Sequence, residues 1–465
     1  MTRHRGHSTI DVLSDDDLLY IFDFYRQELK DDYHKTWPWH MLVHVCQRWR
    51  NIIFAWPQHL DLRPPCESRT AAARALDVWP TLPIRIHSLP DIPRSDNRDD
   101  IIDALEYRDR IAEIHLSFLT GSQLERCAAW LQEPFPLLRS LFLRCYSPYS
   151  GDAPVITDAF LGGSTPHLQR VDLSGIPVPT IPKFLTSAPD LVFLSLESIT
   201  GTRHISPGQV ATCVSMLKKL EYLSICFESR GSFPEPEPSN QFSPRTRAVL
   251  PKLAKFFFRG VSEYFEDLIS RVDAPLLHRL YLGFFDKPIF SVPQLSQFFH
   301  RIEWLRSPLE AVVIIFKDYI DVSILPSVGG ILRLDFLCTG PDRQMSLFAQ
   351  FCAQCLPLLS HISKLYLTRF NPAQTDQQGS SPWLRFLRPF NSLQILDIWE
   401  VQLGVQIAGA LGELTADRVA EVFPMLHTLM LRWFDGVESL VVPLLKPFVY
   451  ARQLLDRPVE VQIIR

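Results

Sequence analysis

The chain has 465 residues, of which 46% are hydrophobic and 21% are charged, and its formal net charge is -4. This length allows about three ordinary domains, or one large repeat array with a small module attached. A charge balance this close to neutral gives no electrostatic case for nucleic acid or an anionic membrane as a partner, because both favour a strongly basic face.

Two further features of the sequence bear on where the protein works. No segment approaches a run of about 18 uncharged apolar residues, and residues 1–13 contain no apolar run of signal-peptide length, so we expect no membrane span. The nine cysteines are odd in number and irregularly spaced, which argues against a disulfide framework. We therefore expect a cytoplasmic or nuclear protein whose cysteines are mostly buried and reduced.

The first predicted helix spans residues 15–29. Ser14 suits the N-cap position, and Asp17, three residues later, completes a capping-box pattern with an acidic first turn. Apolar side chains then recur at helical spacing, at Leu18, Ile21, Phe22 and Tyr25.

A second helix is predicted to begin near Thr36, with Pro38 tolerated in its first turn. Its apolar stripe consists of Leu42, Val45, Cys46, Trp49, Ile52 and Ile53. A segment of this size buries little surface by itself, so we expect the two helices to need a partner.

These two predicted helices resemble the F-box found in many mushroom-type fungal F-box proteins. Residues 13–22 read LSDDDLLYIF and are similar to the family's opening, although Ser14 stands where the family usually has proline. Residues 42–52 read LVHVCQRWRNI and contain the Val-Cys-x-x-Trp-Arg pattern of the family's second half. The stretch between the halves is longer than usual, and the resemblance covers residues 10–86 and is looser beyond.

The resemblance implies that these helices dock on the Skp-type adaptor of an SCF (cullin–RING) ubiquitin ligase while the rest of the chain recruits a target protein. The residues carried over as adaptor-facing are Leu13, Leu18, Leu19, Phe22, Leu42, Val45, Cys46 and Trp49. Some of them must pack the F-box internally, and the sequence does not divide the two sets. The plain alternative is a helical hairpin that caps the following domain.

Beyond residue 105 a short pattern returns along the chain, often a proline followed by Leu-x-x-Leu-x-Leu. Its closing apolar positions are 116, 143, 173, 196, 225, 258, 282, 314, 336, 367, 398 and 431. They lie 22–33 residues apart, which is the period range of leucine-rich repeats. The alternation within each copy predicts a short strand with one buried face.

The residues between these strands are numerous enough for a helix and two turns, as parallel neighbours require. The segments with apolar residues at helical spacing are 122–131, 180–187, 207–217, 262–270, 293–304, 345–355 and 415–422. The asparagine ladder of regular leucine-rich repeats is absent from the sequence, so an irregular repeat is expected. Residues 231–244 and 371–382 read as exposed loops.

The predicted fold class is α/β: an N-terminal helical F-box followed by an irregular leucine-rich-repeat-like (ribonuclease-inhibitor-like) solenoid with a curved parallel sheet. The predicted boundaries are 8–62 for the F-box, 63–105 for a connector that includes a possible strand at 82–86, and 106–465 for the solenoid. The alternative is an α/β domain whose proline–leucine turns merely look periodic.

The sequence contains no phosphate-binding glycine loop, no GxSxG elbow and no HExxH helix, so we predict no catalytic residue, no metal site and no cofactor. His40 and His44 share a predicted helix face without a third ligand and are read as surface histidines. The lone Cys352-x-x-Cys355 lies in an apolar helical stretch and is read as packed core.

Strand alternation predicts which side chains reach the concave face of the sheet. If Leu141 and Leu143 point into the core, Phe142 and Arg144 point outward. The same rule exposes Asp172, Ser195, Glu197, Phe257, Arg259, Tyr281, Tyr366, Thr368, Asp397, Trp399, Met430 and Arg432. Because aromatic residues and arginines are enriched at interface hot spots, the predicted target-binding residues are Arg144, Arg259, Tyr281, Tyr366, Trp399 and Arg432.

The function predicted on this basis is that of a non-catalytic substrate receptor, with a Skp-type adaptor, a cullin complex and an unidentified target protein as partners. One alternative is a leucine-rich-repeat interaction scaffold that does not join a ligase. Another is an enzyme whose site has no familiar sequence motif.

Overall fold

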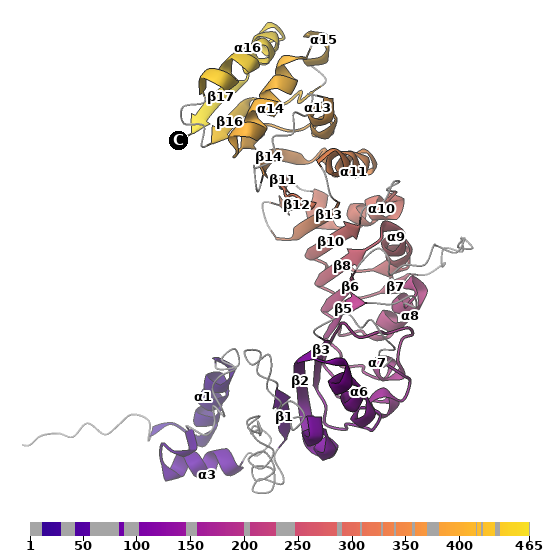
Figure 1. The fold of residues 1–465 in the computed structure, drawn as a ribbon. Helices are drawn as coiled ribbons and strands as arrows, with labels where there is room; N and C mark the ends of the chain where they lie inside the picture. Colours follow the sequence, from indigo (N-terminus) through magenta and orange to yellow (C-terminus); the bar gives the residue numbers. More distant parts are fainter. Residues whose placement is uncertain are drawn as a thin grey trace, which may run out of the picture. The chain divides into compact units, whose positions relative to one another are not determined.

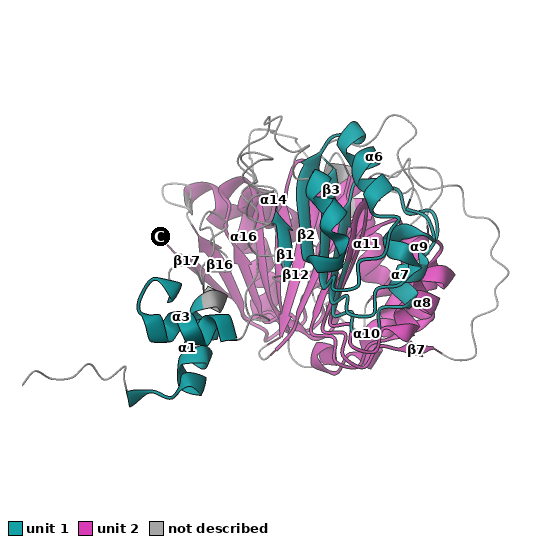
Figure 2. Ribbon diagram, turned by 90° about the horizontal axis from the view of Figure 1, so that it is seen from below, with its two compact units in different colours: residues 1–194 teal, residues 195–465 magenta. Residues whose placement is uncertain are grey.

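The computed structural model describes residues 12–28, 42–55, 83–87, 102–145, 156–199, 205–228, 247–285, 291–306, 309–326, 329–338, 341–355, 359–369, 381–414, 416–419, 422–432 and 438–464. They form a mixed α/β protein (Figure 1) that divides into two compact units, residues 1–194 and 195–465 (Figure 2). Among these residues, none of the helices combines the length and the apolar character that a bilayer crossing requires.

The N-terminal helices are α1 (Asp15–Glu28) and α3 (Gln47–Ala55). The predicted capping box is present, because the Asp17 amide donates to Ser14 Oγ at 3.1 Å while the amide and hydroxyl of Ser14 donate to Asp17 Oδ2 at 3.1 and 2.6 Å. The hydrogen bonds from the hydroxyl and the amide of Ser14 lower the pKa of the Asp17 carboxyl. The start of α1 therefore follows from local sequence alone.

The predicted second helix is interrupted. Residues 42 and 43 are helical, His44 and Val45 form a turn, Cys46 follows it, and α3 begins at Gln47; the predicted start near Thr36 lies outside the described residues. The reason is a cap, since Cys46 Sγ accepts the Trp49 amide at 3.5 Å, in the place where a serine or aspartate oxygen usually stands. Val45 and Cys46 consequently lie before the helix and are exposed.

The sheet of the first unit is parallel. Its strands pair in the order β1 (Ile84–His87), β2 (Ile111–Leu119), β3 (Ser140–Cys145) and β4 (Arg170–Ser174). The elements that precede or connect these strands are η4 (Ala104–Arg110), α6 (Gly121–Trp130), η5 (Phe160–Gly163) and α7 (Lys183–Thr186). The next strand, β5 (Phe193–Ile199), begins at the last residues of this unit.

The sheet of the second unit is larger and curved (Figure 1). Its strands pair in the order β6 (Tyr222–Phe227), β8 (Lys255–Gly260), β10 (Arg279–Phe285), β13 (Ile331–Leu337), β12 (Tyr319–Pro326), β11 (Leu309–Ile315), β14 (Ile362–Arg369), β15 (Ile395–Ile398), β16 (Thr428–Arg432) and β17 (Glu460–Ile464). Only β12 runs antiparallel to its neighbours, and β7 (Ala248–Val249) with β9 (Val272–Asp273) makes a separate short pair.

The helices of the second unit connect these strands. They are α8 (Pro207–Met216), α9 (Ser262–Ser270), α10 (Pro293–Arg301), η7 (Glu303–Arg306), α11 (Pro341–Gln354), α13 (Ser381–Leu387), α14 (Val401–Gly412), α15 (Ala416–Val419) and α16 (Glu438–Leu454). Figure 1 shows α8–α11 along one face of the sheet. Alternate strand residues are buried under this layer; Phe256 and Phe258 are each 2% exposed, whereas Phe257 between them is half-buried.

All twelve segments predicted from the repeat are strands, and the prediction of a mixed α/β protein with a large, mostly parallel sheet is confirmed. The possible first strand at 82–86 corresponds to β1. Cys352 and Cys355 are 0% and 1% exposed, as expected for packed core cysteines. The predicted loop 231–244, residues 371–380 of the other predicted loop, His40 and most of the predicted connector lie outside the described residues, whereas residues 381 and 382 begin α13. The predicted domain boundaries stay predictions.

The sheet departs from a simple repeat between β10 and β14. A regular array would place β11 beside β10, but β13 pairs with β10, and the unpredicted antiparallel strand β12 links β11 to β13. The side-chain register of β11 is also one residue from the prediction, because Val313 and Ile315 are buried while Ile314 is half-buried. A run of apolar residues shows no alternation, so the register follows the neighbouring strand, where Leu367 pairs with Val313.

An aromatic cluster lies between the sheet and helix α9 of the second unit. The ring centroid of Phe258 lies 4.7 Å from that of Phe265 and 6.4 Å from that of Phe284. All three side chains are at most 2% exposed. Rings packed this closely contribute by burial and by their edge and face contacts.

Replacing Phe258 with alanine is expected to lower the free energy of unfolding by about 3–5 kcal/mol, because it opens a cavity in this cluster. The matched control is Phe257→Ala, one residue earlier on the open face, which should cost no more than about 1.5 kcal/mol. Chemical denaturation of both variants measures the difference. Equal losses would contradict the one-sided burial of β8.

Candidate functional site

The packing between α1 and α3 divides the predicted adaptor-facing residues. Leu18 and Phe22 are 1% and 6% exposed, and the ring of Phe22 lies 4.7 Å from that of Trp49. Val43, Ile52 and Ile53 complete this buried contact. Leu18 and Phe22 therefore pack the helix pair internally. Four of the other predicted residues are half-buried, namely Leu13, Leu19, Leu42 and Trp49. The remaining two, Val45 and Cys46, are exposed.

Arg48, on α3, forms hydrogen bonds and an ion pair with residues at the start of α1. Its Nη2 lies 2.7 Å from Asp15 Oδ1 and donates to the Leu13 carbonyl at 2.6 Å, while its Nε donates to Asp15 Oδ1 at 3.1 Å. The pair is partly exposed, so it adds little stability. Its effect is to hold the two helices in one relative orientation.

A second apolar face of α1 is left open. Tyr20, Ile21 and Phe24 are 78%, 44% and 60% exposed, and Tyr20 and Ile21 lie four and three residues before Phe24, so both neighbour it on the helix surface. We call these three residues the exposed α1 face. Val12, Val45 and Phe54 are further exposed apolar residues of the same helix pair. The sequence placed Ile21 in the same stripe as Leu18 and missed Tyr20 and Phe24, although their four-residue spacing was a signal for a shared face.

Arg144 lies on the open face of the first unit's sheet. Its guanidinium is 4.9 Å from the ring centroid of Phe142, and its Nη2 is 3.8 Å from Asp172 Oδ2. The His115 ring lies 3.9 Å from the Phe142 ring, so neighbouring strands present an aromatic pair beside the arginine. Burial, then the nearby His87 and Arg144, lower the pKa of His115 from 6.5 to about 4.

Tyr281 belongs to a stack of three rings on the open face of the second unit. Its ring lies 4.3 Å from that of Phe257 at an interplanar angle of 4°, and Tyr222 lies 5.0 Å from Phe257 on the other side. Arg259, two residues after Phe257, is exposed and lies across Gly283 of the next strand. A Cβ on Gly283 would come within 3.1 Å of Arg259 Cγ, so the glycine makes room for this side chain.

Beside this stack, one arginine is shared by two carboxylates. Arg333 Nη2 lies 2.7 Å from Asp321 Oδ2, and its Nε lies 3.4 Å from Asp335 Oδ1. Asp321 and Asp335 are directly opposite each other on β12 and β13. Burial raises the pKa of both carboxyls, and Arg333 opposes that effect. Without the arginine the cross-strand acidic pair would repel.

The remaining three predicted target-binding residues meet at β14–β16. Arg432 lies 5.1 Å over the ring of Trp399, whose ring is 6.4 Å from that of Tyr366. Arg432 is held from below by Asp397, with Nε at 2.9 Å from Oδ1 and Nη2 at 3.0 Å from Oδ2. Trp399 is 44% exposed. We call Tyr366, Trp399 and Arg432, with their anchor Asp397, the Trp399 cluster.

Two side chains at the rim of this cluster were missed from the sequence. Lys364 Nζ lies 4.5 Å over the Tyr366 ring, and the Tyr366 hydroxyl donates to Glu310 Oε2 at 3.2 Å. Two other sequence predictions are wrong, because Asp397 and Ser195 are buried at 0% and 1% exposure. Asp397 lies beneath Arg432, and Ser195 donates to Glu197 Oε1 at 3.1 Å, so a polar strand position does not ensure exposure.

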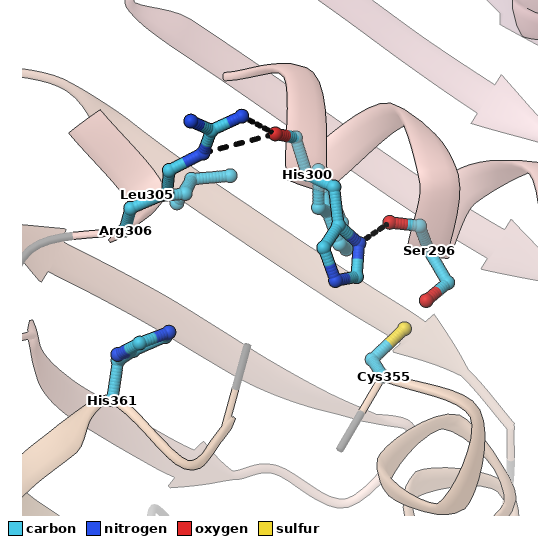
Figure 3. Close-up of a pocket in the computed structure, with 7 residues that line it drawn as sticks. Ser296, His300, Leu305, Arg306, Cys355 and His361 are labelled. Carbon is cyan, nitrogen blue, oxygen red and sulfur yellow. Dashed lines mark hydrogen bonds between the residues drawn. The ribbon is translucent and has the colours of Figure 1, made fainter. Parts of the chain in front are cut away.

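A small cavity of about 40 Å³ lies between α10, η7 and the start of β14, and Figure 3 shows its residues. The side chains that line it include His300, His361, Arg306 and Cys355. His300 Nδ1 lies 2.7 Å from the Ser296 carbonyl oxygen, and Arg306 Nε donates to the His300 carbonyl at 3.1 Å. A cavity of this size holds a few water molecules. Within the described ranges, no group of three or more histidine, cysteine or acidic side chains is arranged to hold a metal ion.

No protein-family model matches this chain, and no curated protein matches it in sequence. The function must therefore be argued from the surfaces described above.

The lowered pKa of His115 predicts a pH effect on stability. Between pH 6.5 and about 4 the unfolded state binds a proton on this ring and the folded state does not, so unfolding takes up a proton and stability falls as the pH falls. We expect His115→Phe to lose less stability than the wild type over this window. Denaturation curves at several pH values measure the difference, and parallel losses in the two proteins would contradict the buried, neutral histidine.

Proposed function

We propose that this protein is the substrate-recognition subunit of an SCF-type (cullin–RING) ubiquitin ligase. In this proposal α1 and α3 form an F-box that binds the Skp-type adaptor, and the open face of the sheet binds the target protein. The observation that carries it is the exposed α1 face, three large apolar side chains on a helix pair whose internal contact is already complete. Apolar side chains gathered in this way favour a protein partner.

The separation of α1 into buried and exposed apolar residues narrows the set of residues proposed to contact the adaptor. Leu18 and Phe22 hold the helix pair together, so the adaptor contact falls to the exposed α1 face with Val45 and Cys46. The half-buried residues Leu13, Leu19, Leu42 and Trp49 lie at the border of this contact.

The sheet is proposed to be an irregular leucine-rich-repeat-like solenoid. What supports this is the succession of strand and helix along the chain, with parallel strands whose alternate residues are buried. The insertion of β12 marks where the repeat is irregular. The target-binding surface is the Trp399 cluster together with Arg259 and Tyr281, since tryptophan, tyrosine and arginine are the residues enriched at interface hot spots.

The role of such a receptor is geometric. Other subunits transfer ubiquitin, and this chain raises the effective concentration of the target near them. The proposed location is the cytoplasm or the nucleus. An interaction scaffold with the same fold but without an adaptor is the alternative, and the next two experiments separate them.

Replacing Ile21 or Phe24 with glutamate is expected to weaken co-purification of a Skp-type adaptor at least tenfold, because a charge is buried at the contact. Both residues are exposed, so the helix pair should stay folded. Met216→Glu is the matched control, since Met216 is 52% exposed on α8 of the second unit. Wild-type protein that ignores the adaptor would remove the ligase proposal and leave the scaffold.

Trp399→Ala and Tyr366→Ala are expected to leave adaptor binding intact and to reduce target capture. The measurement is quantitative proteomics of ubiquitinated proteins in cells that carry the wild type or one variant. A receptor predicts that the proteins lost with Trp399→Ala are also lost with Phe24→Glu, whereas Met216→Ala changes nothing. If Trp399→Ala has no effect while Phe24→Glu does, the target binds elsewhere on the chain.

A further inference from the structure

β17 is the outermost of the described strands at its end of the sheet, so one of its edges has no strand partner among them. Among the described strands β17 pairs only with β16, and the Glu460 amide donates to the His427 carbonyl at 2.9 Å. In a parallel strand, successive residues direct their amide and carbonyl groups to opposite sides. Glu460, Gln462 and Ile464 therefore face β16, while the backbone groups of Val461 and Ile463 face the open edge.

This edge lacks the usual protection against further pairing. Natural edge strands carry several charges, a proline or a bulge. The sequence of β17, EVQII, contains one charged residue and no proline, and its register with β16 is unbroken. The strand is suited to accept another strand.

Apolar side chains are also left uncovered in β17. Val461 and Ile463 pair in register with Leu429 and Leu431 and so lie on the helix-covered side of the sheet. Leu429 and Leu431 are each 1% exposed, whereas Val461 and Ile463 are only half-buried. The helix layer therefore stops short of completing the core at this end.

The helix α16 shows the same incompleteness. Val441, Leu445 and Phe448 are buried at 0%, 2% and 0% exposure and make its internal contact. A second set of large apolar residues on the helix is exposed: Leu440, Leu444, Tyr450 and Leu454, at 61%, 38%, 64% and 68%. A terminal unit of a repeat array normally carries a polar outer face. Here both the strand and the helix present apolar surface instead.

We propose that this end of the sheet binds a second copy of this chain, with β17 antiparallel to β17 about a two-fold axis through Gln462. The axis sets Val461 opposite Ile463 of the second copy, and each such pair exchanges two amide–carbonyl hydrogen bonds. All four open amide and carbonyl pairs are then satisfied. The valine and isoleucine side chains of both copies meet on the helix-covered side and complete the core there.

The charge pattern favours a second copy over an unrelated strand. The same axis places Glu460 opposite Ile464 of the second copy, so the one carboxylate of β17 does not meet its symmetry mate. Gln462 meets Gln462, and two amides can hydrogen-bond to each other. The exposed apolar residues of α16, the helix that precedes β17 in the chain, would add to the contact. A self-complementary patch of this kind is what a two-fold interface requires.

The mass of the full chain in solution tests the proposal. Light scattering or sedimentation is expected to give twice the chain mass of 53.5 kDa at micromolar concentration. Ile463→Pro removes an edge amide without touching the ladder to β16, and Leu454→Glu places a charge on the exposed helix surface; both should give monomers. The matched control Gln453→Glu, which adds the same charge one residue earlier, should stay dimeric. A wild type that is monomeric throughout would overturn the proposal.

A cysteine pair tests the register directly. In the proposed arrangement Gln462 faces its mate in a non-hydrogen-bonded pair with Cα atoms about 4.5 Å apart, a separation that a disulfide spans. Under mild oxidation Gln462→Cys should therefore form a covalent dimer. Glu460→Cys, whose mate lies roughly 14 Å away at four strand residues, should not. Cross-linking at residue 460 but not at 462 would refute this two-fold pairing.

Discussion

The structure of the second unit depends on a mostly parallel sheet, one face of which is covered by helices in the described part of the chain. Backbone pairing holds successive side chains on opposite faces of each strand, so the covered face must be apolar and the other face is free to vary. In β8 the covered residues Phe256 and Phe258 join the core while Phe257 turns outward. The in-register pairing of neighbouring strands then sets Phe257, Tyr281 and Arg333 in one row across the open face. The surface that could bind a partner is thus a consequence of how the core is made.

Burying a charged group beneath that open face costs free energy of desolvation, which a nearby opposite charge must offset. Asp397 is fully buried, and a carboxylate in that position is tolerated only because Arg432 meets it with two nitrogens. The pairing holds the guanidinium over Trp399 and leaves the indole partly in solvent. An indole held in place before binding loses less freedom when a partner arrives. The same logic applies to Tyr281, whose ring already stacks on Phe257.

The parts of the fold that follow from local pattern could be predicted from the sequence. Ser14 and Asp17 indicate the start of α1, and the recurring Leu-x-x-Leu-x-Leu spacing predicts the strands. The pattern fails where a run of apolar residues is unbroken. Residues 311–315 read AVVII, and only contact with β14 and β12 decides which side chains are buried. Helix α16 contains Pro443 and Pro447, which normally interrupt a helix, and so it was missed.

The residues of the candidate sites could be predicted from the sequence, but which of them are exposed and which are buried could not. Alternation identified Tyr366, Trp399 and Arg432 as outward residues, but Asp397 has the same parity and is buried, because an arginine two strand positions along the neighbouring strand covers it. The stripe of α1 likewise contained the right residue types. Which of them face α3 depends on where that helix begins, and its cap at Cys46 is a local contact that a sequence does not announce, because cysteine is not a usual N-cap residue.

The proposed pairing of β17 would join the open faces of two copies of the sheet. An antiparallel strand added in the plane of the sheet continues both of its faces. The helix-covered face of one copy meets the helix-covered face of the other, and the open face meets the open face. The open faces of two copies then form one continuous surface, with Gln462 of each copy at its centre and a Trp399 cluster on either side. A target with two binding segments would meet the second cluster at high effective concentration once the first is bound, so two weak contacts would suffice for retention. A receptor of this design needs no deep pocket, and the largest recognition elements described in the second unit are indeed flat rows of aromatic and charged side chains.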